Sequence, residues 1–283
     1  MSVLDTRCVN QLYLTLSNIL SISESDLRQY VIDKKFELLD IAWSEIDIDE
    51  FFKTVKSNVN RLKGNIIESV TISHLSSRLE YECNKENIYN LYSALTGETK
   101  LRKYLSDVGI ECIHESDVIS VFFHGERIDW KQYEQTPVVL MLQKRLGVTS
   151  SADKCINGFL FSGDIHKNMN VTHIARIPEF LENLLRILKV HEAIYFWERN
   201  AQPYEIIFKE KFSGIIYDGD DSLSLEDKNI KTIKHCISFL GRNLFNEWNQ
   251  NDNPIIRLKD DNDVLADQII SSRNLKTNRI IFK

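Results

Sequence analysis

Segments with a helical pattern come first in this chain, and segments with a strand pattern follow them. Within residues 8–62, apolar residues recur at intervals of three and four, as in "CVNQLYLTLSNIL", and the third helical segment stops at Gly64. The stretch Asn65–Glu80 is instead rich in β-branched residues, which favours a strand. Later strand patterns do not alternate regularly with helical ones, which disfavours a doubly wound parallel sheet. This order predicts an α+β fold with N-terminal helices packed on a mixed, mainly antiparallel β body.

The remaining patterns predict the elements of that body. Helices are expected over residues 87–109 (two, divided at Gly97), 136–147, 177–189 and 223–248. Strands are expected in residues 117–130 (a hairpin that turns at Gly125), 154–168, 193–198, 204–209, 214–219, 254–258 and 279–282. The chain is thereby divided into a helical region (1–64), an α+β body (65–250) and a polar tail with short strands (251–283). No Pro-, Gly- or Ser-rich linker follows the helical region, so its helices should pack on the body.

Composition limits the cell compartment and the class of partner. The formal net charge is −6 and the isoelectric point is about 5.7, which argues against broad, non-specific binding of nucleic acid. No basic segment followed by an apolar block opens the chain, and no apolar run reaches the length of a membrane span. The five cysteines are scattered and never form CxxC, which fits a reducing, cytoplasmic location. They are Cys8, Cys83, Cys112, Cys155 and Cys236.

Several well-known nucleotide and metal motifs are missing from the sequence. It contains no GxxxxGK[ST], no GxGxxG and no HExxH, so P-loop, Rossmann and zinc-protease mechanisms lose their usual support. His166 and His173 are seven residues apart across a loop, a weak basis for a shared metal. The acidic stretch Asp218–Asp221 could gather Mg²⁺, as a nuclease would require, or form an acidic turn that caps the following helix. No metal is expected.

The stretch "TISHLSSRL" combines groups that suit a nucleotide. His74 stands near the end of the β-rich run, where it could hydrogen-bond ribose hydroxyls. Arg78 could form a bidentate pair with a phosphate, and Ser76 lies between the two. A polar residue at a strand boundary is the structural alternative for His74.

Glu205 opens the apolar run "EIIF". A carboxylate in this position could stabilise the oxocarbenium character that develops when a glycosidic bond to ribose breaks, and this chemistry needs no metal and no glycine-rich loop. The alternative is an ordinary solvent-facing strand residue. Tyr195 and Trp197 alternate in the expected strand 193–198 and could stack on a base, although core packing is the commoner use of such residues.

The segments "ISHLSSR" and "YEIIFKEKFSGIIYD" together resemble the ADP-ribosyltransferase layout, most closely the DarT-like toxins that modify nucleic acid. The resemblance covers about Asn65 to Asp221, and it lacks a clear Ser-Thr-Ser stretch and a Glu-x-Glu pair. It implies NAD⁺ as cosubstrate and a role as a bacterial toxin or anti-phage effector, such as the mRNA-modifying toxin of a toxin–antitoxin–chaperone system. On this resemblance Glu205 and His74 are catalytic, and His74, Ser76, Arg78 and Tyr195 bind NAD⁺.

Three functions therefore stay open at the level of sequence. The first is transfer of ADP-ribose to an RNA, DNA or protein acceptor, with an antitoxin or immunity protein as a further partner and no membrane involved. The second is a non-catalytic interaction or immunity protein that binds through its N-terminal helices. The third is a Mg²⁺-dependent nuclease that uses Asp218, Asp220 and Asp221.

Overall fold

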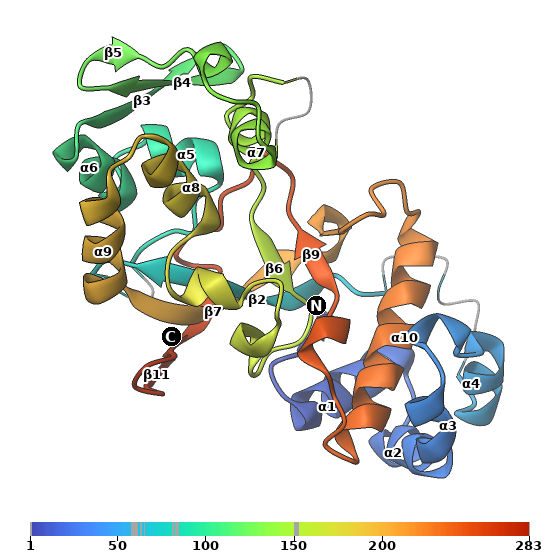
Figure 1. The fold of residues 1–283 in the computed structure, drawn as a ribbon. Helices are drawn as coiled ribbons and strands as arrows, with labels where there is room; N and C mark the ends of the chain where they lie inside the picture. The colour runs from blue at the N-terminus through green and yellow to red at the C-terminus, as the bar shows by residue number, and fades with distance from the viewer. Residues whose placement is uncertain are drawn as a thin grey trace. The chain divides into compact units, whose positions relative to one another are not determined.

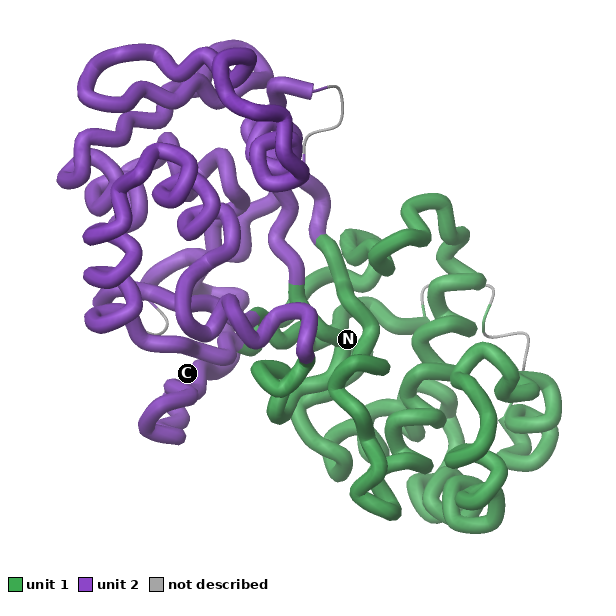
Figure 2. Tube along the Cα trace, in the orientation of Figure 1, with its two compact units in different colours: residues 1–74, 158–168, 207–257 green, residues 75–157, 169–206, 258–283 purple. Residues whose placement is uncertain are grey.

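The computed structural model describes residues 2–57, 62, 64, 66–80, 82, 85–149 and 153–282. Asn65 and Cys83 lie outside the described residues. The chain divides into two compact units, and each is built from three separate segments (Figure 2). Unit 1 contains residues 1–74, 158–168 and 207–257, and unit 2 contains residues 75–157, 169–206 and 258–283. These segments differ from the division at residues 64 and 250 expected from the sequence.

The helices of unit 1 gather around its longest helix, α10 (Figure 1). Helix α10 (Leu225–Asn243) is contacted by the three N-terminal helices α1 (Val9–Leu20), α2 (Glu24–Asp33) and α3 (Lys35–Asp40), and by the short 3-10 helix η1 (Trp43–Glu45). A fourth N-terminal helix, α4 (Ile48–Thr54), follows η1. Gly241 permits the close approach of α3, because a Cβ at this position would lie 2.7 Å from the Cβ of Leu38. The N-terminal helices and α10 thus share one core.

The strands of unit 1 follow the order β7-β2-β6-β9-β8, with β1 paired to β2. They are β1 (Val3–Leu4), β2 (Ser69–Arg78), β6 (Asn157–Phe159), β7 (Gln202–Lys211), β8 (Ile216–Tyr217) and β9 (Ile255–Arg257). The pairs β2–β6 and β8–β9 are antiparallel, whereas β1 runs parallel to β2. The division between the units falls within β2, after His74, within β6, after Asn157, and within β7, before Ile207, so these three strands contribute to both units.

Unit 2 packs its helices and a small antiparallel sheet around one hydrophobic core. The helices are α5 (Leu91–Thr96), α6 (Lys100–Asp107), α7 (Pro137–Arg145), α8 (Glu179–Ile187) and α9 (His191–Asn200). The small sheet has the order β3-β4-β5, with β3 (Ile110–Glu115), β4 (Val118–Phe123) and β5 (Glu126–Arg127). A second antiparallel pair, β10 (Ile269–Asn274) and β11 (Ile280–Phe282), extends the order to β11-β10-β7.

The α+β class predicted from the sequence is confirmed, and so are most of its elements. Strands β2 and β7, helices α7, α8 and α10, the division of α5 from α6 at Gly97 and the turn at Gly125 lie where their patterns indicated. The strand expected over residues 193–198 is wrong, because these residues belong to helix α9. Strands β1, β3 and β10 were not predicted.

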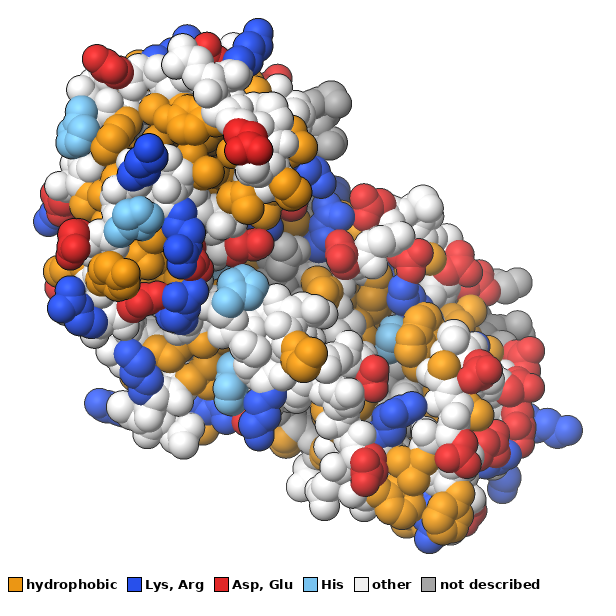
Figure 3. Space-filling view, viewed as in Figure 1, with side chains coloured by type: hydrophobic (Ala, Val, Ile, Leu, Met, Phe, Trp, Pro, Cys, Tyr) orange, Lys and Arg blue, Asp and Glu red, His pale blue; other side chains and the backbone are white. Residues whose placement is uncertain are grey.

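Hydrophobic side chains also reach the surface of each unit (Figure 3). In unit 1, Phe36 of α3 is 66% exposed and Leu244, just after α10, is 45% exposed. The Phe36 ring lies 5.8 Å from the ring of Phe245. In unit 2, the neighbours Tyr195 and Phe196 of α9 are 54% and 48% exposed. Solitary exposed apolar residues are ordinary, but Tyr195 and Phe196 are neighbours in the chain and the Phe36 ring lies near Phe245.

Candidate functional site

Glu205 lies on β7 with its carboxylate in the interior of unit 2. Its side chain is 3% exposed, and Oε2 lies 2.7 Å from a terminal guanidinium nitrogen of Arg273 on β10. The alternative interpretation of Glu205 as a solvent-facing strand residue is therefore wrong. An opposite charge at this distance offsets part of the cost of withdrawing a carboxylate from water. Glu205 is thus an interior charge held by a partner from another strand.

Ser76 and Arg78 lie together at the end of β2 in unit 2. Arg78 donates a hydrogen bond from Nε to Ser76 Oγ at 3.1 Å and one from Nη1 to the carbonyl of Asn87 at 3.2 Å. Ser77, on the opposite face of the strand, is buried and accepts a hydrogen bond from Trp197 Nε1 at 3.0 Å. One face of β2, with Ser77, is therefore buried in the core, and Ser76 and Arg78 lie on the opposite face.

His74 lies on the same face of β2 as Ser76 and Arg78, because the three residues occupy alternate positions of the strand. Its side chain is half-buried. It is the last residue of unit 1 in this strand, whereas Glu205 belongs to unit 2. In the sheet order β7 is the neighbour of β2. A shared role of His74 and Glu205 in one cleft stays a prediction.

Tyr195 does not have the setting expected for it. It lies on helix α9 rather than on a strand, and its side chain is 54% exposed. Trp197, two residues on, is buried, as are Ala193, Ile194 and Ala201, so the buried positions follow the period of a helix. The proposed alternation of Tyr195 and Trp197 on one strand face is wrong.

The acidic stretch after β8 is balanced by basic side chains of unit 1. Arg257 lies 3.6 Å from the carboxylate of Asp218 and 3.5 Å from that of Asp221, and Lys231 forms an ion pair with Asp220. Ser224, and not the acidic stretch, caps α10. Over the described residues, no three His, Cys, Asp or Glu side chains are grouped as metal ligands. Basic side chains thus lie next to the carboxylates that would have to bind a Mg²⁺ ion.

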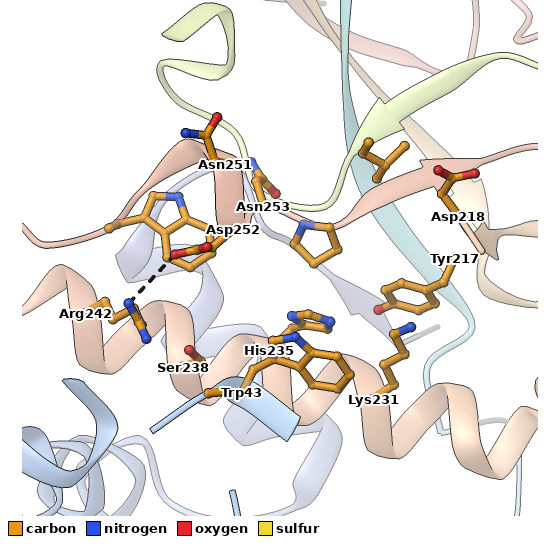
Figure 4. Close-up of a pocket in the computed structure, with 14 residues that line it drawn as sticks. Trp43, Tyr217, Asp218, Lys231, His235, Ser238, Arg242, Asn251, Asp252 and Asn253 are labelled. Atoms are coloured by element: carbon orange, nitrogen blue, oxygen red, sulfur yellow. Dashed lines mark ion pairs between the residues drawn. The ribbon is translucent and has the colours of Figure 1, made fainter. Parts of the chain in front are cut away.

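A cavity of about 520 Å³ opens in unit 1 between η1, β8, α10 and the segment that precedes β9 (Figure 4). One face of α10 forms its floor, because Lys231, His235, Ser238 and Arg242 are spaced by four, three and four residues. The other lining residues are Ala42, Trp43, Tyr217, Asp218, Trp248, Asn251, Asp252, Asn253, Pro254 and Ile255. All of them belong to unit 1.

Aromatic rings flank His235 at this floor. The Trp43 ring is stacked on the imidazole with 4.0 Å between ring centroids, and the Tyr217 ring lies 5.9 Å away at an interplanar angle of 12°. Burial, assisted by the positive charge of Lys231, lowers the pKa of His235 from 6.5 to about 3. The imidazole is therefore neutral at physiological pH and offers one donor and one acceptor.

The charged groups of the cavity are paired within the protein. Arg242 lies 3.7 Å from the carboxylate of Asp252 and donates a hydrogen bond to the carbonyl of Ile41 at 3.2 Å. Lys231 pairs with Asp220, and its ammonium also lies 4.7 Å from the centroid of the Tyr217 ring. The lining thus carries charges of both signs near one another.

The sequence patterns did not predict this cavity. The available signal was the set of polar residues at positions 231, 235, 238 and 242 on a helix whose other residues in this stretch are largely apolar. Such a row can equally face solvent, and only the packing of η1 and the segment before β9 over it encloses a space.

Comparison of the chain with models of protein families, with curated proteins and with solved structures found no match. No helix among the described residues has the combination of length and apolar character needed to cross a bilayer.

Proposed function

We propose that this protein transfers ADP-ribose from NAD⁺ to a macromolecular acceptor and that Glu205 assists cleavage of the nicotinamide–ribose bond. The observation that carries the proposal is the interior position of Glu205, 3% exposed and 2.7 Å from Arg273. A carboxylate in a site of low dielectric acts more strongly on a developing positive charge than one in water does. The resemblance of the β2 and β7 segments to ADP-ribosyltransferases supports the same assignment.

The ion pair between Glu205 and Arg273 has to open for this mechanism to operate. A carboxylate that stays fully paired with a guanidinium stabilises an oxocarbenium ion only weakly, because the two charges offset each other. The proposal therefore requires that Arg273 turn from Glu205 toward the diphosphate of NAD⁺ when the cosubstrate binds. A guanidinium suits that role, since its fork of donors matches phosphate oxygens.

Ser76 and Arg78 are the proposed NAD⁺-binding groups on β2. Their mutual hydrogen bond orients the guanidinium, and the neighbouring position of β2 and β7 in the sheet order supports a common site in unit 2. His74 remains in the proposal from the sequence resemblance alone. Tyr195 is left out, because α9 presents it to solvent.

The acceptor and the partners follow from the resemblance alone. It favours a nucleic-acid acceptor and a toxin or anti-phage role, with an antitoxin or immunity protein as partner. The net charge of −6 is more compatible with a protein acceptor or with a local basic contact. RNA, DNA and protein fractions therefore have to be tested side by side.

The test is transfer of label from [³²P]NAD⁺ to RNA, DNA and protein fractions of a cell extract. Wild type should label one fraction, and Glu205→Gln should lose on the order of 10² to 10³ in rate, because the amide keeps the size but not the charge. Glu210→Gln, on the same strand, is the matched control and should retain activity. Chelator should leave the transfer unchanged. Equal labelling by wild type and Glu205→Gln would remove Glu205 from the mechanism.

A non-catalytic interaction protein is the second candidate, favoured by the exposed apolar side chains of Phe36 and Leu244 near the end of α10. This function predicts no transfer of label by wild type under any condition. It also predicts that Phe36→Asp abolishes binding of a partner recovered with wild type, while Phe196→Asp, on α9, does not. Transfer of label by wild type would decide against it.

A further inference from the structure

The lining of the cavity in unit 1 includes polar groups that have no hydrogen-bond partner among the described residues, and the buried indole N–H of Trp248 is one of them. His235 and Ser238 are each 5% exposed, and within the described part of the chain neither side chain forms a hydrogen bond. Buried polar groups are nearly always hydrogen-bonded, because leaving one unsatisfied is costly. Both face the same cavity from neighbouring turns of α10 (Figure 4). The cavity therefore presents hydrogen-bonding groups whose partners the described residues do not supply.

These groups specify a ligand with both donors and acceptors. A neutral imidazole has one N–H donor and one ring-nitrogen acceptor, and a serine hydroxyl has one donor and can accept as well. The backbone of the floor is already engaged in α10, so the side chains carry the recognition. A purely apolar ligand would leave both groups unsatisfied.

The charge balance disfavours a polyanion. The two cations of the lining, Lys231 and Arg242, are matched by Asp220 and Asp252, and Asp218 of the lining is matched by Arg257. A diphosphate or triphosphate would have to displace these carboxylates or lie beside them. An uncharged ligand meets no such penalty.

The shape of the cavity favours a planar ring. Trp43, His235 and Tyr217 lie in near-parallel planes at 28° and 12° to one another, so the wall is itself a stack of flat rings. Planar heteroaromatic ligands extend such stacks favourably. A volume of about 520 Å³ falls within the range of small-molecule sites and accommodates a ring with a sugar attached.

We propose that this cavity binds an uncharged nitrogen heterocycle of the nucleobase or nucleoside type, recognised by His235 and Ser238. The heterocycle edge supplies the donors and acceptors that both side chains lack, and its face packs along Trp43 or Tyr217. The site lies in unit 1 and does not depend on the ADP-ribosyl transfer proposed for Glu205 of unit 2.

The test is isothermal titration of the full chain with adenosine, guanosine, cytidine and uridine, with the free bases, and with the 5′-triphosphates at matched ionic strength. At least one nucleoside or base should bind wild type. Ser238→Ala should weaken that binding about 3- to 10-fold, the effect of one lost hydrogen bond. His235→Phe keeps the ring stack but removes both nitrogens and should weaken binding by a larger factor. Ser222→Ala and His191→Phe, both at exposed positions, are the matched controls and should bind as wild type does.

Three results would overturn the proposal. One is the absence of heat from every nucleoside and base with wild type. The second is equal affinity in wild type and Ser238→Ala, a variant chosen because it removes a single oxygen and should fold. The third is a triphosphate that binds ten or more times as tightly as its nucleoside, which would make the cavity an anion site.

Discussion

The carboxylate of Glu205 and the guanidinium of Arg273 form an ion pair in the interior of unit 2. Glu205 is 3% exposed and the Arg273 side chain 23% exposed, so removal of the arginine takes its counter-charge from a carboxylate that has almost no contact with water. We expect Arg273→Ala to lower the free energy of unfolding by about 3 kcal/mol or more, as other broken interior ion pairs do. Glu205→Gln should cost less, because the cation it leaves is partly solvated.

Urea denaturation at neutral pH measures both losses. The control is Arg127→Ala, which breaks the pair with Glu115 on the surface, where the two side chains are 62% and 44% exposed. That variant should change the stability by no more than about 1 kcal/mol. If Arg273→Ala lowered the free energy of unfolding no more than the control does, the interior pair would contribute no more to stability than a surface pair.

His235 predicts a dependence of stability on pH. Burial lowers the pKa of its imidazole from 6.5 to about 3 in the folded protein, so the unfolded chain binds a proton between these values and the folded chain does not. Stability is therefore lost as the pH falls below about 6.5, by up to about 1.4 kcal/mol per pH unit. Lys231 faces the imidazole and adds to the effect.

The matched variant for this measurement is His235→Gln, which has no titrating ring. Urea denaturation between about pH 7 and about pH 5 should show a wild-type stability that falls relative to the variant, while the carboxylates common to both cancel in the difference. A difference that does not change with pH would mean that His235 is protonated as readily in the folded state as in the unfolded chain.

Single elements were predictable where one pattern was dominant. The long apolar face of α10 and the β-branched run of β2 both appeared at their observed positions, because local spacing is sufficient for such elements. The stretch "AIYFWE" has the aromatic and β-branched residues that favour a strand. It folds as part of α9, whose buried side chains, Ala193, Ile194 and Trp197, follow a helical period that the six-residue window did not reveal.

Gly241 fixes the approach of α3 to α10. An alanine Cβ there would lie 2.7 Å from the Cβ and 2.8 Å from Cδ1 of Leu38, both closer than packed carbons allow. The gain in helix propensity of about 1 kcal/mol is outweighed by overpacking of about 1–3 kcal/mol. We expect Gly241→Ala to lower the thermal midpoint, whereas Glu226→Ala in the exposed first turn of α10 should leave it nearly unchanged. A higher midpoint for Gly241→Ala would show that α3 moves away at little cost.

At the scale of the whole molecule, the chain passes between its two units several times. Unit 1 combines the N-terminal helices, a short middle segment and the region of α10, and residues 75–157 and 169–206 of unit 2 separate these three segments along the chain. Spacing along the sequence does not reveal such interleaving, which explains why the expected division at residues 64 and 250 differs from the compact units. For the same reason the sequence named Glu205 but not Arg273, and α10 but not the cavity above it.

The interleaving predicts that the N-terminal helices cannot be removed. Every residue of α10 from His235 to Gly241 is buried, so this part of the helix needs packed neighbours around it except on the face that lines the cavity. The helices α1, α2 and α3 are among those neighbours. Exposure of even three large apolar residues of α10, Ile233, Ile237 and Leu240, would cost about 5–9 kcal/mol, comparable with the whole stability of a typical domain.

We therefore expect a chain of residues 66–283 to aggregate or to elute as an expanded species in size-exclusion chromatography, without a cooperative thermal transition. The matched truncation is a chain of residues 1–277, which lacks β11. Its side chains Ile280, Ile281 and Phe282 are 50%, 39% and 66% exposed, so little burial is lost and the thermal midpoint should fall only slightly. A monomeric 66–283 chain that melts cooperatively near the wild-type midpoint would show that α10 and the strands form a core of their own. The N-terminal helices would then be an appendage rather than a part of unit 1.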